Sequence, residues 1–273
     1  MIYSQTILQL YKQLDHNGYE KSDKELIFLA HKLAIELSSG LIRPSGKTHI
    51  SHLIGTASVL AHMKVNIELV AAGLLHSIYS LGDFGYGPSG INIMKRDYVK
   101  NAVNKRVEDY VYRYSIVKWS ENNYISRIHH EIEQYDGILK NVVLLRLADI
   151  ADELIDSGIM YCPNAEARIS GYKKNIPTLI DIANKMGYKE MGDQLSELLE
   201  QNLNTTITAE IRQSPGTNRT RLIPPRSYQK KFHVVTIQMA KVAYLNSKMI
   251  IQRTVRFTKR QIVKRIQFRN NEN

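Results

Sequence analysis

The chain has 273 residues, of which 43% are hydrophobic and 23% are charged, the composition of an ordinary globular protein. This composition argues against disorder of the whole chain, and the length allows one large domain with an appendage or two modest domains. The single cysteine, Cys162, excludes an intrachain disulfide and a cysteine-based zinc site. No run of about eighteen apolar residues occurs, and polar residues interrupt the N-terminus. We expect a cytoplasmic protein that is neither secreted nor membrane-spanning.

The net charge of +11 is concentrated at the C-terminal end of the chain. Residues 212–273 contain fifteen lysines and arginines against one acid, Glu272, a surplus of fourteen positive charges that leaves the first 211 residues at about −3. The sequence therefore predicts a mildly acidic body with a basic tail. A protein that binds nucleic acid over its whole surface is expected to be basic throughout.

Apolar residues recur every three or four positions through most of the first two hundred residues, which predicts an all-α fold. Ser22 and Glu25 have the spacing of a capping box at the start of a helix, and Asn66 can cap another. The first three predicted helices cover residues 22–37, 49–62 and 67–79. The third is apolar on nearly all sides, which places it at the centre of a helical bundle. A glycine-rich loop follows at residues 82–90.

The second half of the body continues the helical pattern. Helices are predicted over residues 95–117, 121–134, 138–157, 163–174, 176–186 and 188–203, with Gly and Pro residues between them. Residues 204–228 lack periodicity and contain Pro, Gly, Thr and Asn, which is typical of a linker. We therefore expect a helical domain over residues 1–203, a linker over 204–228 and a basic, amphipathic and helical segment over 229–273.

Three short motifs follow one another in an order that is specific. RPSGKTHISH at residues 43–52 ends in His52, VAAGLLH ends in His76, and LLRLADIADEL contains Asp149. This order resembles the His…His-Asp…Asp layout of the HD superfamily of metal-dependent phosphohydrolases. It is most similar to the hydrolase half of RelA/SpoT-type enzymes, which remove pyrophosphate from (p)ppGpp with a manganese ion.

The resemblance covers roughly residues 22–203, because AHKLA before the motifs and IPTLIDIANKMGYKEMGDQLSELLEQ after them also have counterparts in that hydrolase domain. One feature places the chain nearer to a different group. The segment HSIY has His-Ser where the superfamily has His-Asp, and this variant resembles bacterial HD-like domains without an established activity. The resemblance implies an HD-type bundle without naming a reaction.

Two imidazoles and a carboxylate from separate helices can hold one divalent ion with open positions for water and phosphate. We predict that His52, His76 and Asp149 are these ligands and that the ion is manganese, iron or zinc. The alternative is that both histidines are hydrogen-bonded core residues, since they lie on strongly apolar helix faces.

The chain departs from the family pattern at several positions. Ser77 replaces the metal-binding aspartate, and a hydroxyl supplies less charge to a hard cation than a carboxylate. Ser80 and Leu81 replace the acidic pair that acts on the attacking water in the alarmone hydrolases. Glu153 replaces an asparagine. We therefore do not expect hydrolysis of (p)ppGpp by the usual route.

Four acidic residues are candidates for the missing ligand or base: Asp83, Glu108, Asp152 and Glu153. The sequence does not select among them, although Asp83, Glu108 and Glu153 are the predicted catalytic residues.

An anionic substrate group has candidate partners beside His52. Arg43 offers a planar fork for phosphate, Lys47 a point charge and His49 an imidazole, and Ser77 is a further candidate for substrate binding. In the resembling enzymes the residue at position 43 packs on the guanine ring. The alternative is an ordinary solvated loop before the helix.

These observations favour a metal-dependent phosphohydrolase acting on a phosphorylated small molecule or nucleotide. The first alternative is a degenerate, catalytically inactive HD module that binds a nucleotide or protein partner. The second is a scaffold localised by its basic tail. Because the tail is rich in Val, Ile and Met and has no aromatic platform for bases, we favour an anionic membrane surface or a protein partner over nucleic acid. Peripheral attachment to the inner face of a membrane would follow. A separate alternative is that the tail packs back on the domain itself.

Overall fold

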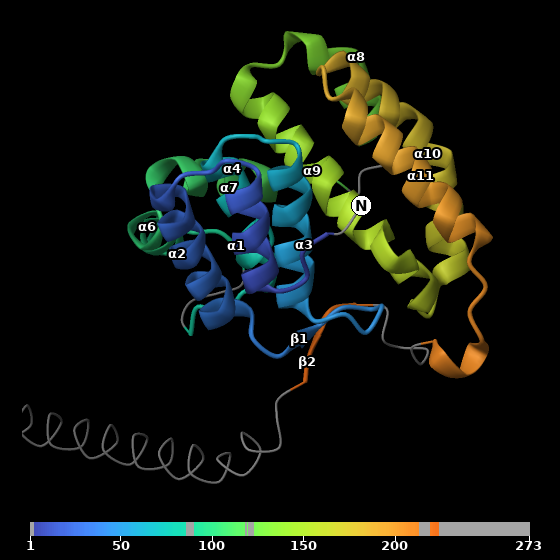
Figure 1. The fold of residues 1–273 in the computed structure, drawn as a ribbon, viewed down its shortest axis with the longest axis horizontal. Coiled ribbons are helices and arrows are strands. Elements are labelled where there is room, and N and C mark those ends of the chain that lie inside the picture. The colour runs from blue at the N-terminus through green and yellow to red at the C-terminus, as the bar shows by residue number, and fades with distance from the viewer. Residues whose placement is uncertain (1–2, 86–89, 118, 120–122, 213–218, 224–273) are drawn as a thin grey trace, which may run out of the picture. The chain divides into compact units, whose positions relative to one another are not determined.

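The computed structural model describes residues 3–85, 90–117, 119, 123–212 and 219–223 (Figure 1). The basic segment predicted over residues 229–273 lies outside this described part of the chain. Within it the predicted all-α fold is confirmed: helices form a bundle around one hydrophobic core, and the strands are limited to one pair of two-residue segments.

The N-terminal helices form the larger part of that core. They are α1 (Ile7–His16), α2 (Lys21–Ser38), α3 (His49–His62), α4 (Ile67–Gly73), α5 (Ile78–Leu81), α6 (Ile93–Ala102) and α7 (Lys105–Ile116). α3 is buried along most of its length because its sequence is apolar on nearly every side. It begins after Thr48, whose hydroxyl accepts a hydrogen bond from the backbone N–H of Ser51. This central position makes α3 a rigid platform for the residues it carries.

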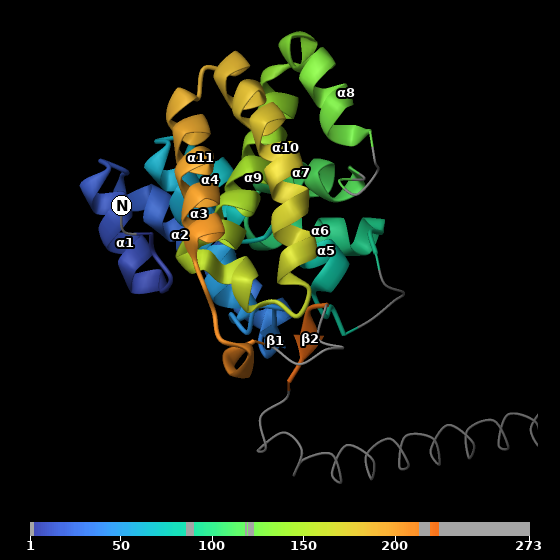
Figure 2. The ribbon, with the colours of Figure 1, turned by 90° about the vertical axis from the view of Figure 1, so that its right-hand side faces the viewer.

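The C-terminal helices form a second group, which contacts α3 through α9. They are α8 (Tyr124–Glu131), the short 3₁₀ segment η1 (Ile132–Gln134), α9 (Gly137–Leu154), η2 (Ile155–Tyr161), α10 (Ala165–Lys185), α11 (Lys189–Asn204) and η3 (Ala209–Ile211). Figure 2 shows α10 and α11 side by side as a helical hairpin. α9 therefore joins the two groups, and it carries acidic residues on the side that faces α3.

The only strands among the described residues are β1 (Leu41–Ile42) and β2 (Arg221–Leu222), which pair antiparallel with Leu41 opposite Leu222. The backbone N–H of Ile223 also donates to the carbonyl of Gly40. β2 lies within the segment predicted to be a linker. The compact unit extends through Ile223, beyond the predicted domain end at residue 203.

Several helix boundaries differ from the prediction. The expected helix at 67–79 is divided into α4 and α5. Between them Nδ1 of His76 donates to the carbonyl of Gly73, and the backbone hydrogen bonds reach three residues back instead of four. The expected helix at 95–117 is divided where Asn104 caps α7 by accepting from the N–H of Val107. Conversely, α10 runs through Pro177, which was expected to separate two helices.

The capping residue of α2 also differs from the prediction. The helix begins at Lys21, before Ser22, and the backbone N–H of Glu20 donates to the carboxylate of Asp23 over 2.9 Å. α1 has no counterpart among the predicted helices. It begins after Thr6, whose side chain forms a capping box with Gln9.

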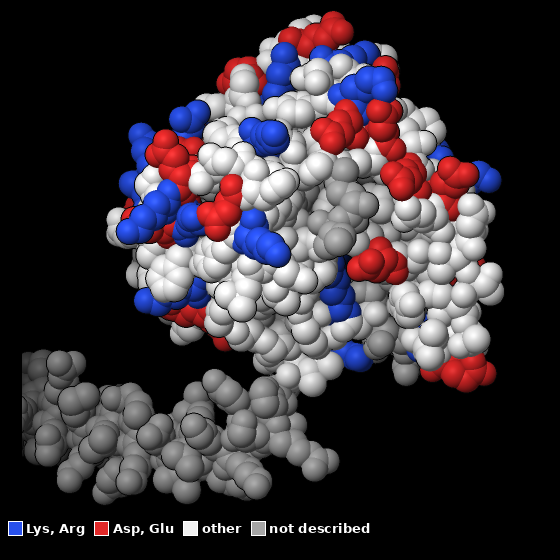
Figure 3. Space-filling model, in the orientation of Figure 1, with Lys and Arg blue, Asp and Glu red and all other residues white. Residues whose placement is uncertain are grey.

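The described surface carries charges of both signs, and Figure 3 shows acidic and basic side chains interspersed on one face. Among the described residues, no helix combines the length and the apolar character needed to cross a bilayer.

Candidate metal centre

The three predicted ligands converge in the core although they come from distant parts of the chain. His52 lies on α3, His76 in the turn after α4 and Asp149 on α9. The Nε2 atom of His52 is 3.3 Å from Nε2 of His76 and 3.2 Å from Oδ1 of Asp149, and Nε2 of His76 is 3.6 Å from the same oxygen. All three side chains are buried. The structure thus brings the predicted set together.

The Nδ1 atoms of both imidazoles are held by hydrogen-bond acceptors. Nδ1 of His76 donates to the carbonyl of Gly73 over 2.9 Å, and Nδ1 of His52 donates to the carboxylate of Asp152 over 2.7 Å. A neutral imidazole that is protonated on Nδ1 has a lone pair on Nε2. Both lone pairs therefore point into the space beside Asp149.

This arrangement fits a divalent cation. With both rings protonated on Nδ1, three electron-pair donors face one another, an arrangement that a positive charge among them would stabilise. Ligands at about 2.0–2.2 Å from an ion in tetrahedral geometry lie about 3.3–3.6 Å apart, close to the separations above. Two imidazoles and one carboxylate suit manganese, iron or zinc, and three protein ligands leave coordination positions open.

The second oxygen of Asp149 is fixed by two groups. Oδ2 accepts a hydrogen bond from the hydroxyl of Tyr114 at 2.5 Å and forms an ion pair with Arg146. Burial opposes the ionisation of Asp149, but the positive charge of Arg146 outweighs it and holds the pKa of the carboxyl well below its ordinary value. Asp149 is therefore an anion at neutral pH, as a metal ligand must be.

Ser77 contacts a histidine that is not one of the three ligands. Its hydroxyl lies 2.9 Å from Nε2 of His49, which is fully buried. Burial, and then the neighbouring ring of His52, lower the pKa of His49 to about 2. A neutral His49 offers no positive charge to a phosphate, and its part in binding an anionic substrate group stays a prediction. The geometry instead pairs Ser77 with His49.

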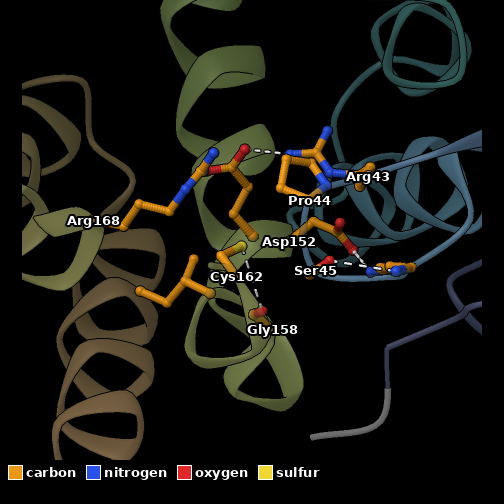
Figure 4. A pocket seen from close by; sticks show the side chains of 10 residues that line it. Arg43, Pro44, Ser45, Asp152, Gly158, Cys162 and Arg168 are labelled. Atoms are coloured by element: carbon orange, nitrogen blue, oxygen red, sulfur yellow. Dashed lines mark hydrogen bonds and ion pairs between the residues drawn. The ribbon is translucent and has the colours of Figure 1, made fainter. Parts of the chain in front are cut away.

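Arg43 and Lys47 line a pocket together with Asp152, the hydrogen-bond partner of His52. Figure 4 shows Arg43, Ser45 and Asp152 around this pocket. The polar and charged residues around it include Arg43, Ser45, Lys47, Asp152, Glu153 and Arg168. Arg43 forms an ion pair with Glu153, and Nζ of Lys47 lies 2.6 Å from Oδ1 of Asp152. The cavity volume is about 20 Å³, room for about one or two water molecules. An anion that binds Arg43 or Lys47 would compete with these acidic partners.

The three predicted catalytic acids lie in different surroundings. Asp83 is exposed, and its carboxylate accepts a hydrogen bond from the backbone N–H of Gly85. Glu108 is buried and accepts two hydrogen bonds from Arg96 and one from Tyr79. Neither belongs to the group of potential metal ligands among the described residues.

Glu153 is the predicted catalytic acid that lines the pocket. Its carboxylate accepts hydrogen bonds from Arg43 and from the hydroxyl of Tyr172. Burial opposes its ionisation, but Arg43 outweighs that effect and lowers the pKa of Glu153.

Sequence reasoning missed several residues around the ligands. Tyr114 and Arg146 hold Asp149, and Arg146 has a visible signal, since it precedes Asp149 by one helical turn in RLAD. Asp152 was only one of four acidic alternatives, although its spacing of three residues from Asp149 places both on one face of α9.

The buried histidines predict a loss of stability in acid. In the folded chain, burial is the main cause that lowers the pKa of His76 to about 4 and the pKa of His49 to about 2. In the unfolded chain both histidines have a pKa of about 6.5. Between these values the unfolded state binds more protons, so the free energy of unfolding falls as the pH falls below 6.5. For metal-free protein we expect a loss of about 4 kcal/mol between about pH 7.5 and pH 5, measured by urea unfolding. A loss below about 1 kcal/mol would contradict the burial of neutral rings.

No curated protein matches the chain. Residues 35–118 are similar to a family described as a domain of unknown function, DUF6817, and this match includes His52 and His76 and ends before Asp149.

Proposed function

We propose that this chain is an HD-type, divalent-metal-dependent phosphohydrolase that acts on a phosphorylated small molecule or nucleotide. The observation that supports it is the convergence of His52, His76 and Asp149, with the lone pairs of both Nε2 atoms directed toward one carboxylate oxygen. The resemblance of the three motifs to HD phosphohydrolases is the second support.

The chain's own residues have distinct tasks in this proposal. His52, His76 and Asp149 hold the ion, while Tyr114 and Arg146 orient the carboxylate of Asp149. A bound manganese, iron or zinc ion would supply Lewis-acid activation of a water molecule and charge neutralisation at a phosphate oxygen.

The adjoining pocket supplies substrate contacts. Arg43 and Lys47 bind the anionic group of the substrate, since their positive charges lie beside the metal cluster and line a space open to solvent. Binding requires Arg43 to exchange Glu153 for a substrate oxygen. The freed carboxylate of Glu153 is then placed in the pocket as an acceptor for a proton.

The inactive nucleotide- or partner-binding module is a second candidate, supported by two observations. Ser77 brings no carboxylate to the site and its hydroxyl contacts His49. The charges of Arg43 and Lys47 are balanced by acidic partners, which weakens their attraction for an anion. In this alternative the same residues bind a ligand without turning it over.

A screen of phosphate monoesters, nucleotides and pyrophosphate-bearing nucleotides with the manganese-loaded full chain separates the two candidates. The phosphohydrolase proposal predicts turnover that chelation abolishes and that His52→Asn reduces to background, because a ligand is lost. His62→Asn is the matched control. It lies at the exposed end of the same helix, where His62 contacts Glu190, and should leave turnover unchanged.

The outcomes of this screen are distinct. Manganese binding without turnover of any phosphoester would favour the inactive module. Turnover that persists in His52→Asn would contradict the metal site as the catalytic centre.

A further inference from the structure

α3 and α9 make an unusually close contact beside the metal ligands, at Gly55 and Asp152. A Cβ atom added to Gly55 would lie 1.7 Å from Oδ1 of Asp152 and 2.7 Å from its Cγ. Both separations are far inside van der Waals contact, so no side chain fits at position 55 while Asp152 stays in place. Gly55 is therefore the position on α3 that admits this carboxylate.

The carboxylate admitted there is buried and fully engaged. Oδ2 of Asp152 accepts a hydrogen bond from Nδ1 of His52 over 2.7 Å, and Oδ1 lies 2.6 Å from Nζ of Lys47. Lys47 holds one oxygen, and the other faces the imidazole. His52 and Gly55 are three residues apart on α3, so the ring and the space for its partner lie on one face of the helix.

We propose that Asp152 is the positioning residue of the metal centre and that Gly55 is required because it leaves room for Asp152. The hydrogen bond from Nδ1 fixes the orientation of the His52 ring and directs Nε2 toward His76 and Asp149. Without the carboxylate the ring can rotate about its χ2 angle, and the proton can move to Nε2. A carboxylate or carbonyl behind a histidine ligand commonly has this orienting effect.

This inference rests on the proposed metal site but not on turnover. It also explains how α9 serves the site twice, since Asp149 supplies a ligand oxygen and Asp152, one turn later, supports a ligand on the opposite helix.

Manganese affinity of the full chain, measured by isothermal titration calorimetry, tests the role of Gly55. Gly55→Ala is expected to lower the affinity by about 10- to 100-fold, the usual effect of losing such a partner. Gly171→Ala is the matched control. It also replaces a glycine inside a helix, but no atom lies within 4 Å of the added Cβ, so affinity should be unchanged.

A double-mutant cycle separates positioning from helix packing. Asp152→Ala alone should lower the affinity to a similar extent, and Gly55→Ala should add no further loss in that background, because the carboxylate it displaces is gone. Wild-type affinity in Gly55→Ala, or losses that multiply in the double variant, would overturn the proposal.

A proton NMR measurement on metal-free protein tests the hydrogen bond between His52 and Asp152 directly. The Nδ1 proton of His52, bonded to a buried carboxylate, should give a protected, strongly downfield proton resonance in chelator-treated protein. The resonance should persist in Gly171→Ala and disappear in Gly55→Ala and Asp152→Ala. Its absence from the wild-type protein would overturn the positioning role, whereas its presence in a chain that binds manganese but turns over no phosphoester would overturn only the proposed function.

Discussion

Asp149→Asn is expected to abolish measurable manganese binding and to lower the free energy of unfolding of the metal-free chain by about 2 kcal/mol. The amide removes the negative charge that the cation requires, so the affinity loss should exceed the roughly 100-fold caused by losing an outer partner. Stability falls because Arg146, which pairs with Asp149 beside the buried hydroxyl of Tyr114, is left without its counter-charge. Calorimetric titration and urea unfolding measure the two effects.

The control for this substitution is Asp109→Asn on α7. Asp109 also pairs with an arginine on its own helix, since its Oδ2 lies 2.8 Å from Nε of Arg113, but about a third of each side chain is exposed. Such surface pairs contribute little, so the change in unfolding free energy should stay below about 0.5 kcal/mol and metal binding should be unchanged. Equal effects of the two substitutions would show that Asp149 has no special role.

Glu108→Gln is expected to destabilise the fold by about 3 kcal/mol while leaving manganese affinity unchanged. Glu108 is buried and accepts a two-pronged hydrogen bond from Arg96, with distances of 2.7 and 2.9 Å, and a third bond from Tyr79. An amide cannot accept both bonds from the guanidinium, which leaves a charge without compensation. Urea unfolding measures the change in stability, and manganese titration of the same preparation measures the affinity.

Glu131→Gln provides the comparison for Glu108. Glu131 is half-buried and accepts a hydrogen bond from the neutral hydroxyl of Tyr135 over 3.0 Å, so its substitution should cost less than about 1 kcal/mol. If Glu108→Gln instead weakened manganese binding and left stability intact, the predicted catalytic role of Glu108 would regain support over the structural one.

The sequence predicted the helical fold and the three candidate ligands for different reasons. Helical periodicity is a local signal, so it located most helices without any knowledge of packing. The grouping of His52, His76 and Asp149 came from the motif order of a resembling family, because no local rule joins residues so far apart. The structure places their ligand atoms within 4.8 Å of one another.

The remaining features depend on contacts that only the folded chain makes. The division of the helix at His76 follows from a side chain that captures the carbonyl of Gly73. The neutrality of His49 follows from burial under other helices. The role of Asp152 requires Gly55, nearly a hundred residues earlier, and the sequence gives no sign that the two positions meet.

The charged loop before α3 has one feature that the sequence predicted and one that it did not. Arg43 and Lys47 line a pocket, which agrees with their predicted position near a substrate. Their pairing with Glu153 and Asp152 was not predicted, since ion pairs across the bundle depend on how α9 is placed against that loop.

Equilibrium dialysis of the chelator-treated full chain against manganese, followed by elemental analysis, tests the central claim most directly. The arrangement of two Nε2 lone pairs and one carboxylate oxygen predicts one manganese ion per folded chain, and none in the His52→Asn/His76→Asn variant. A folded wild-type chain that retains no manganese, iron or zinc would contradict it.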